Sequence, residues 1–527
     1  MKWPVEAQFG RAILTIFGHI GRGQSPRKLC FMSLPRIVYV LLVLMLACAV
    51  FVVNGIFPWP FGYDIWLTAA AIKEVALFPD AMLDPVLPMP VDGSPRIVPY
   101  AVGWGWFMRF TGFEVFTVVG LAGAVNVLLL GLGLYLFCKN WYHNGLLALW
   151  ALPAMMLVWG TGFGWANAYH LELYLMIAAY VGSFSFSTSL IALALLANFI
   201  KRGSRVGLLG YGLLAMLVFV SHPITGAFLF VGAAAMLLSF HRYKQLLLLQ
   251  LVPLAVLLLS MLWPYYNMWD VLTGGTSEAW FISGLFKRQF GALGLLLLGF
   301  VPAVWLALNR GDWLPLFGAV LCGLVYGIAF LLEVRIGGRF VLYGAFFLHL
   351  ALARGAKELL LEGGSLVKKP ALRWGGLAAV VLLLGTGIAE RVQGFQTHYS
   401  EARLPNGNGP VMELMFVQGE LHRGDVLLAD PTVAWAIPAI TDAKVVAASK
   451  IDPIRFADNE VRKADVATFL ADETPLDQLL EIIKRYGATH LLLRNNDNMQ
   501  RERLLNHADV QAYTDQYLLL RLQPPGR

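Results

Sequence analysis

Asp64 is the acidic residue whose surroundings most favour chemistry at a membrane surface. It follows an aromatic and proline-rich stretch, 57–63, and precedes an apolar run that continues to Phe78. A residue of this type can cap the N-terminus of a helix that lies in the membrane interface. The same carboxylate, held at a bilayer surface, can remove a proton from an incoming hydroxyl group as a general base. The spacing leaves both interpretations open.

Two arginines, Arg335 and Arg339, flank the pair Gly337-Gly338 in a short turn after an apolar segment. A guanidinium group matches phosphate oxygens through two parallel hydrogen bonds, and glycine lets a backbone approach a ligand closely. The turn therefore predicts a phosphate-binding site. The alternative is a salt bridge from either arginine to Glu333, which stands just before them.

Two histidines stand at the edges of apolar segments. His170 precedes Glu172 by two residues, so the two side chains would share a cavity only if the chain were extended there; a structural hydrogen-bonding role is the alternative. His222 precedes Pro223, where it either lines a substrate path or packs against backbone groups that the proline leaves free. The sequence contains no HExxH, CxxC or histidine cluster. We therefore expect no cofactor from these motifs and leave a divalent metal open.

Further candidates lie in two long connections. The first, 55–113, is longer than an ordinary connector and carries Asp80 and Asp84 among its acidic residues. Long structured loops usually carry function. The second, 265–290, mixes a few charges with aromatic rings. Most of these rings fit an interfacial belt, and one or two can stack against the face of a sugar ring.

The elements that position these residues must be membrane helices. Of the 527 residues, 58% are hydrophobic and 14% are charged, whereas a soluble domain carries about 25% charged residues. Apolar runs long enough to cross about 30 Å of hydrocarbon lie near 34–54, 114–137, 145–163, 171–199, 207–221, 223–240, 245–264, 291–308, 313–332, 340–354 and 372–389. The sequence thus predicts a polytopic α-helical membrane protein of about eleven transmembrane helices.

The charges divide the chain into two parts. Residues 1–390 carry 25 Lys and Arg against 15 Asp and Glu, whereas residues 391–527 carry 15 against 18. The first part is the predicted transmembrane domain, and the second is a predicted soluble α/β domain. Its strands are expected at 425–429, 444–448, 489–493 and within 512–522, with a helix at 475–486. It holds no phosphate-binding glycine loop and no basic, aromatic-interleaved patch for nucleic acid.

Most basic residues of the apolar part would lie on one face of the membrane if the N-terminus were cytoplasmic. They then gather in the N-terminal segment and in alternate short connections, as the positive-inside rule requires. Those in the connections include Lys139, Lys201, Arg310 and Arg354. An odd number of spans places the tail on the periplasmic side of a bacterial inner membrane. None of the four cysteines would lie on that side, so we expect no disulfide there.

In layout the chain resembles membrane glycosyltransferases of the GT-C type over nearly its whole length. The resemblance rests on the segment 62–66 around Asp64, the Ser221-His222-Pro223 break, the turn with Arg335 and Arg339, and the α/β tail. Within the tail, the stretch 429–441 and the following Lys444-Val445-Val446 are similar to the tails of uncharacterised bacterial members.

The resemblance implies transfer of a sugar from a polyprenyl-phosphate donor to a glycan, lipid or protein acceptor at the outer face of the membrane. By position, Asp64 would be the base, and Arg335 and Arg339 would hold the donor phosphate. Asp80, Asp84, His170, Glu172 and His222 would bind substrate in the cavity. The tail has no Trp-Trp-Asp motif. It therefore departs from the oligosaccharyltransferase pattern, and the resemblance does not extend to the metal that goes with that pattern.

Two other functions share some of these features. A multispan transporter or flippase would have a similar helix count, but it should show broken helices at matching positions of two repeats. The sequence shows one such break, at 221–226. A polymerase of surface polysaccharide would use similar lipid substrates, but usually without a soluble C-terminal α/β domain.

Overall fold

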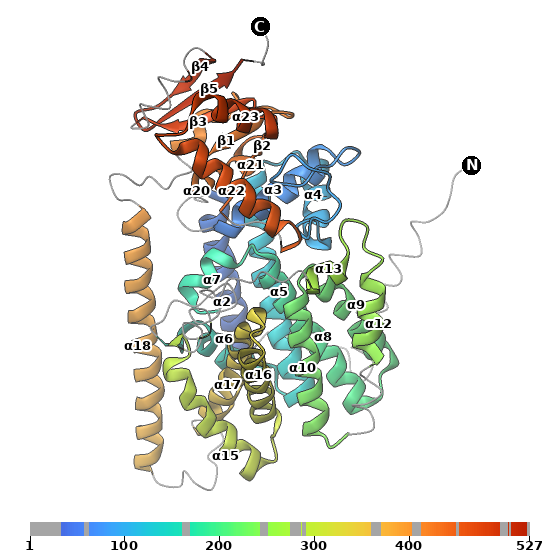
Figure 1. The fold of residues 1–527 in the computed structure, drawn as a ribbon. Coiled ribbons are helices and arrows are strands. Elements are labelled where there is room, and N and C mark those ends of the chain that lie inside the picture. The colour runs from blue at the N-terminus through green and yellow to red at the C-terminus, as the bar shows by residue number, and fades with distance from the viewer. Residues whose placement is uncertain are drawn as a thin grey trace, which may run out of the picture.

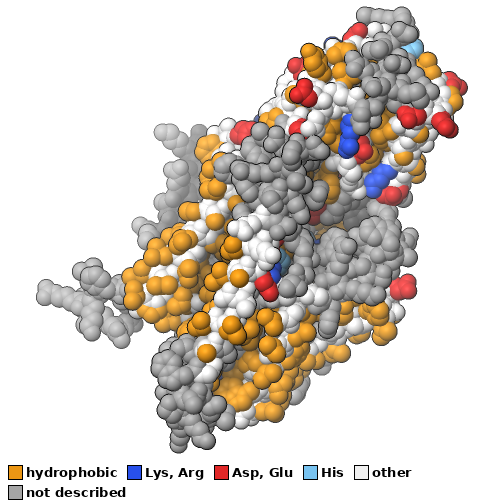
Figure 2. Space-filling model, turned by 90° about the vertical axis from the view of Figure 1, so that its left-hand side faces the viewer, with side chains coloured by type: hydrophobic (Ala, Val, Ile, Leu, Met, Phe, Trp, Pro, Cys, Tyr) orange, Lys and Arg blue, Asp and Glu red, His pale blue; other side chains and the backbone are white. Residues whose placement is uncertain are grey.

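A computed structural model gives the structure of the chain for residues 33–56, 63–160, 169–242, 251–273, 286, 291–359, 370–402, 413–449, 453–495, 504 and 507–523. A bundle of long helices forms the lower part of the molecule, and a small sheet with its helices lies on top (Figure 1). The face in Figure 2 is mainly hydrophobic over the bundle, whereas acidic and basic side chains gather toward the sheet. The predicted division into an apolar domain and a charged α/β domain is therefore visible in the fold.

The helices of the bundle overlap all of the predicted spans. They are α2 (Leu34–Phe51), α5 (Val115–Tyr142), α6 (Ala148–Leu157), α7 (Leu171–Ile177), α8 (Val181–Arg202), α9 (Arg205–Ser221), α10 (Pro223–Ser239), α12 (Leu251–Ser260), α15 (Phe300–Arg310), α16 (Leu314–Leu331), α17 (Phe340–Lys357) and α18 (Pro370–Ala402). Among the described residues, four stretches are long and apolar enough to cross a membrane on their own: Leu34–Ile56, Val115–Tyr142, Val181–Arg202 and Leu314–Leu331. Shorter apolar helices of 10–17 residues include α9, α10 and α12.

Two predicted boundaries differ from the structure. The span expected at 171–199 is two helices, because the chain turns between α7 and α8. The domain boundary expected after residue 390 falls inside α18, which continues to Ala402 and stands along one side of the bundle (Figure 1). The description of the sheet domain then begins at residue 413.

Basic residues meet at the end of the bundle opposite the sheet, which we call the basic end. There Arg354 lies 2.9 Å from Asp312, and Arg310 lies 2.8 Å from Glu358. Lys201, at the end of α8, donates to the Trp141 carbonyl near the end of α5. The alternate connections predicted to share one side therefore do share one end of the bundle. Which face of a membrane that end occupies stays a prediction.

The sheet domain has five strands in the order β2-β1-β3-β5-β4. They are β1 (Val426–Ala429), β2 (Lys444–Val445), β3 (His490–Arg494), β4 (Ala508–Tyr513) and β5 (Tyr517–Leu522). β1 pairs in parallel with β2 and β3, and the other pairs are antiparallel. The predicted α/β class and the strands expected at 425–429, 444–448 and 489–493 are confirmed. Of the two pieces expected within 512–522, β5 lies there, whereas β4 begins earlier, at Ala508.

Two longer helices pack in the sheet domain. α23 (Leu476–Tyr486) buries Leu479, Ile482 and Ile483, whose spacing puts them on one side of a helix. Gly487, with φ near +60°, ends this helix in a conformation that glycine adopts without strain. α22 (Phe456–Leu470) was not predicted.

Between the bundle and the sheet lie α3 (Tyr63–Leu77) and α4 (Pro99–Thr111), both from the long first connection. The sequence predicts that α3 has one apolar side in the membrane interface. Instead every residue from 65 to 76 is buried, because the bundle packs on one side of α3 and α21 (Ile437–Ile440) of the sheet domain packs on another. We call this end of the bundle the sheet-facing end.

Candidate active site at the sheet-facing end

Asp64 lies in the first turn of α3 and is partly buried. The positive end of the helix dipole at this turn stabilises an ionised carboxylate. Tyr180 precedes α8, and its hydroxyl forms hydrogen bonds with the backbone at Asp64 and Ile65. The charged side chains of Asp64 and Arg96 both interact electrostatically with this hydroxyl. A carboxylate, a phenol and a guanidinium group therefore converge at the N-terminus of α3.

A second polar group lies where the bundle is broken at His222, between α9 and α10. The His222 Nδ1 atom and the Thr225 hydroxyl are 2.7 Å apart, and the same hydroxyl lies 2.7 Å from that of Tyr343 on α17. Tyr343 in turn lies within electrostatic reach of Arg339. The structure thus brings His222 and Arg339 together, although the sequence separates them by more than a hundred residues.

Arg339 is half-buried at the start of α17, at the end of the short 3-10 helix η4 (Arg335–Arg339). Glu333 is exposed, and no ion pair joins it to Arg339 among the described side chains, which include both. The alternative of a salt bridge between these two residues is therefore not found. The side chain of Arg335 lies outside the described part of the structure.

Contacts from the connection between α12 and α13 (Met268–Thr273) link the Asp64 group with the His222 group. The indole N–H of Trp263 donates to the Ile97 carbonyl at 2.9 Å, and Ile97 follows Arg96 in the chain. The Tyr266 hydroxyl donates to the Val220 carbonyl, two residues before His222. Both groups therefore belong to the same end of the bundle.

His170 and Glu172 are buried but engaged in structural contacts. The Nδ1 atom of His170 accepts from the backbone N–H of Leu173 at 3.3 Å, which makes this histidine the N-cap of α7. Glu172 lies on α7 itself and 3.8 Å from Arg391 of α18. The locally extended chain that a shared cavity would require is therefore absent from residues 171–177. Arg391 was not predicted; it is a buried cation that also donates to the Gly160 carbonyl at 2.8 Å.

The two acidic candidates of the first connection lie apart from these groups. Asp80 is exposed in the turn after α3. Asp84 is fully buried, and its Oδ1 atom accepts from the backbone N–H groups of Val86 and Leu87 at 2.9 and 3.0 Å. Its Oδ2 atom lies 3.5 Å from Arg455 of the sheet domain. These contacts give Asp84 a structural role in joining the two domains.

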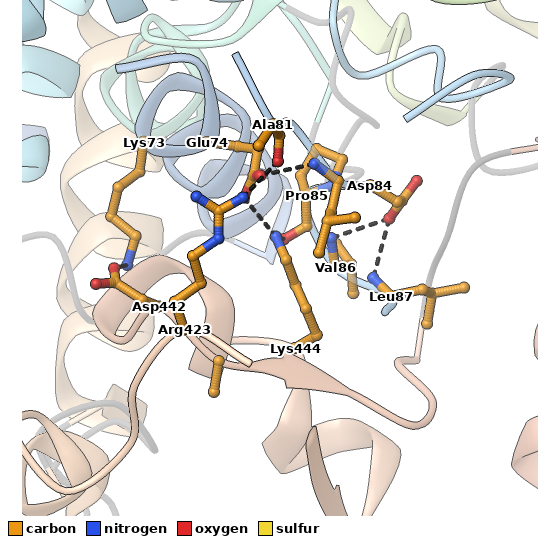
Figure 3. Close-up of polar contacts among 12 residues, drawn as sticks. Lys73, Glu74, Ala81, Asp84, Pro85, Val86, Leu87, Arg423, Asp442 and Lys444 are labelled. Atoms are coloured by element: carbon orange, nitrogen blue, oxygen red, sulfur yellow. Dashed lines mark hydrogen bonds and ion pairs between the residues drawn. The ribbon is translucent and has the colours of Figure 1, made fainter. Parts of the chain in front are cut away.

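Four charged residues fix the sheet domain to α3; we call Lys73, Glu74, Asp442 and Lys444 the domain clamp (Figure 3). Lys73, Glu74 and Lys444 are buried, whereas the side chain of Asp442 is 39% exposed. Lys444 Nζ lies 2.6 Å from Glu74 Oε2, and Lys73 Nζ lies 3.3 Å from Asp442 Oδ1. Opposite charges alternate across the contact, so each lysine meets an acid of the other domain. The signal available in the sequence was the pair Lys73-Glu74 inside an otherwise apolar helix.

Backbone contacts extend the clamp. The N–H of Val445 on β2 donates to the Val86 carbonyl at 2.9 Å, and the second carboxylate oxygen of Glu74 accepts from Leu83 N–H at 2.7 Å. Burial lowers the pKa of Lys73 to about 8, although Asp442 beside it acts in the opposite direction. The helix that carries Asp64 is therefore held by the sheet domain at its other end.

No protein-family model matches the sequence, and no curated protein matches it either. Among solved structures, the chain is similar to the oligosaccharyltransferase of Archaeoglobus fulgidus, solved with a tethered acceptor peptide. That match has 13% identity and a TM-score of 0.48 and covers 88% of this chain and 69% of the other. A second match is ArnT of Cupriavidus metallidurans, with 13% identity, a TM-score of 0.49 and coverage of 93% and 100%.

These two matches describe what the chain is similar to among solved structures. Because both TM-scores lie below 0.5, we take neither activity nor substrate from them. Among the described residues, no three His, Cys, Asp or Glu side chains are grouped as a metal site would require.

Proposed function

We propose that the chain is a membrane glycosyltransferase that moves a sugar from a polyprenyl-phosphate donor to an acceptor that arrives from water. In this proposal the sheet-facing end lies on the periplasmic side of a bacterial inner membrane, and the basic end lies in the cytoplasm. The acceptor is a glycan, lipid or protein, and membrane lipid surrounds the bundle.

The observation that carries the proposal is the presence of Asp64 and Arg339 at the same end of the bundle, linked through Trp263 and Tyr266. A lipid-anchored donor cannot leave the bilayer, so an enzyme that uses it needs a base and a phosphate-binding cation at one membrane surface. An Arg guanidinium group suits a phosphate because it donates two parallel hydrogen bonds.

The proposed reaction is a single inverting displacement. Asp64 accepts the proton of the acceptor hydroxyl, and the hydroxyl oxygen forms a bond to the anomeric carbon of the donor sugar. The bond from that carbon to the phosphate oxygen breaks, and the polyprenyl phosphate leaves with the electron pair, held by Arg339 and, as the sequence suggests, Arg335. No sugar–enzyme bond forms, so one carboxylate is enough.

The contacts of the other candidates suggest supporting roles. Thr225 joins His222 to Tyr343 and thereby fixes the start of α17, where Arg339 lies. His170 caps α7 and Glu172 pairs with Arg391, so we assign them to the support of the cavity wall. We assign no reacting role to Asp80 or Asp84.

Reconstitution into liposomes with radiolabelled polyprenyl-phosphate sugars tests the proposal. Wild type should transfer label from at least one donor to an acceptor added in the water phase. Asp64→Asn should lose about two to four orders of magnitude in rate, as expected for removal of a general base. Arg339→Ala should also lower the rate, whereas Asp515→Asn, at an exposed position of the sheet domain, should not. Equal transfer by all four proteins would overturn the assignment.

A further inference from the structure

A cleft of about 820 Å³ opens between the bundle and the sheet domain, away from the domain clamp. Three separate segments line it: part of the first connection around Asp92, the α12–α13 connection around Tyr265, and the start of α22 around Asp458. Its size lies within the range of about 300–1,000 Å³ that is typical of small-molecule sites. None of its residues belongs to the candidates derived above for catalysis or phosphate binding.

One wall of the cleft is a set of aromatic rings held in place by hydrogen bonds. The rings of Trp263 and Tyr265 lie edge to face, with centroids 5.6 Å apart. The N–H of Trp263 donates to the Ile97 carbonyl of the first connection, and the hydroxyl of Tyr266 donates to the Val220 carbonyl of α9. The Tyr265 carbonyl accepts from Gly93 N–H at 2.9 Å. The wall is therefore ordered before a ligand arrives, which lowers the entropy cost of binding.

The charges that face the cleft leave an excess of carboxylates. Arg455 is held by the carbonyls of Pro90 and Asp92 and lies 3.5 Å from buried Asp84. Asp458 pairs with Arg462 at 2.6 Å. The carboxylates of Asp92 and Asp270 form no ion pair among the described residues, and both residues are exposed at the rim. The cleft therefore offers hydrogen-bond acceptors and repels anions.

We propose that this cleft binds a neutral saccharide and is the place where the glycan part of the acceptor docks; this inference rests on the proposed function. Sugar rings present C–H groups on one face, which pack on an aromatic ring, and hydroxyl donors at the rim, which suit carboxylates. Phosphorylated or uronic sugars and nucleic acids are disfavoured, because Asp92 and Asp270 repel their negative charge.

The position of the cleft fits the delivery of a hydroxyl group to Asp64. Trp263, in the wall of the cleft, donates a hydrogen bond to the Ile97 carbonyl. Arg96, the residue before Ile97, interacts electrostatically with Tyr180, as does Asp64. These contacts connect the wall of the cleft with the N-terminus of α3. The cleft would select the acceptor, while Asp64 and Arg339 would carry out the transfer.

Saccharide binding by the full-length protein in lipid nanodiscs tests the inference without any donor. The probes are the neutral trisaccharides maltotriose, mannotriose and chitotriose and the anionic trigalacturonate, with affinity measured by saturation-transfer NMR titration. At least one neutral probe should bind wild type. Asp270→Asn should weaken that binding about tenfold, as for the loss of one hydrogen bond to a charged group. Tyr265→Ala should weaken it about tenfold as well, because it removes the ring on which the sugar packs. The matched controls Tyr513→Ala and Asp515→Asn, in the sheet domain away from the cleft, should not change it.

The outcomes separate this inference from the proposed function. Failure of every neutral probe to bind, binding that Tyr265→Ala and Asp270→Asn leave unchanged, or equally tight binding of trigalacturonate would each overturn the saccharide cleft. Active transfer in liposomes with those results would leave the glycosyltransferase proposal standing. Neutral binding that depends on Tyr265, without any transfer, would support the cleft and count against the proposed reaction.

Discussion

Replacing Glu74 by glutamine should loosen the attachment of the sheet domain to α3. The charge of Glu74 lies 2.6 Å from Lys444, and the two side chains are only 4% and 7% exposed. At that distance the attraction is about 6 kcal/mol for an effective dielectric constant of 20, and much of it offsets the desolvation of the two ions. Glutamine keeps an oxygen for the Leu83 N–H but leaves the Lys444 ammonium buried without its counterion. We therefore expect a loss of about 3 kcal/mol at this contact.

Hydrogen exchange measured by mass spectrometry reads out this loss at the contact itself. The Val445 N–H, which donates to Val86 across the interface, exchanges only when the contact opens. A loss of 3 kcal/mol should raise its exchange rate about 150-fold, since each 1.4 kcal/mol is a factor of ten. The matched control is Glu481→Gln, which removes an ion pair with Arg485 at 2.8 Å whose side chains are 66% and 48% exposed. That change should cost less than about 0.5 kcal/mol.

The reasoning is wrong if Glu74→Gln accelerates exchange at Val445 no more than Glu481→Gln does. A double variant, Glu74→Leu with Lys444→Met, extends the test. If the cost comes from an unpaired buried charge, the double variant should be more stable at this contact than Glu74→Gln alone.

Three further predictions concern other parts of the chain. The pKa of Lys73 falls to about 8 in the folded chain, so between pH 8 and about 10.5 the unfolded chain binds a proton that the folded chain lacks. The unfolding free energy of wild type relative to Lys73→Met should therefore rise by about 1.4 kcal/mol per pH unit in this range. A difference in denaturation midpoint that stays constant with pH would contradict this prediction. Thr225→Val should cost about 1–3 kcal/mol by removing the hydroxyl between His222 and Tyr343, with recovery in Thr225→Ser; equal midpoints for both variants would count against the link. On α18, an added Cβ at Gly387 would lie 2.2 Å from the Leu157 carbonyl, whereas nothing lies within 4 Å of one at Gly385. Gly387→Ala should therefore lower the melting temperature and Gly385→Ala should raise it through better helix propensity; a shift of the same sign in both would refute the packing of α18 on α6.

The spans and the strands of the tail could be predicted because their signals are local. A run of about twenty apolar residues, or a short buried strand beside an amphipathic helix, is visible without knowledge of any distant contact. The turn between α7 and α8 was missed because Ala178, Ala179 and Tyr180 contain neither glycine nor proline. The extension of α18 was missed because its last turns carry charges that are typical of a soluble segment.

The pairing of the candidate residues could not be predicted from the sequence, because it depends on contacts between distant parts of the chain. The Lys444–Glu74 contact joins residues 370 positions apart, and Arg391 meets Glu172 from a different helix. Asp64 was a candidate because it precedes an apolar run, His222 because it precedes a proline, and Arg339 because it lies in a turn with a second arginine. Asp84 was a candidate as an acidic residue of a long connection, a signal that does not separate a substrate-binding carboxylate from the structural one that its contacts indicate.

The most direct test of the central claim is the rate of sugar transfer by Asp64→Asn together with its affinity for the lipid-linked donor. If Asp64 removes the acceptor proton, the rate should fall at least about a hundredfold while donor binding, measured by equilibrium titration in nanodiscs, stays within twofold of wild type. A variant that transfers sugar at the wild-type rate, or that loses rate only in proportion to lost donor binding, would contradict a base at this position.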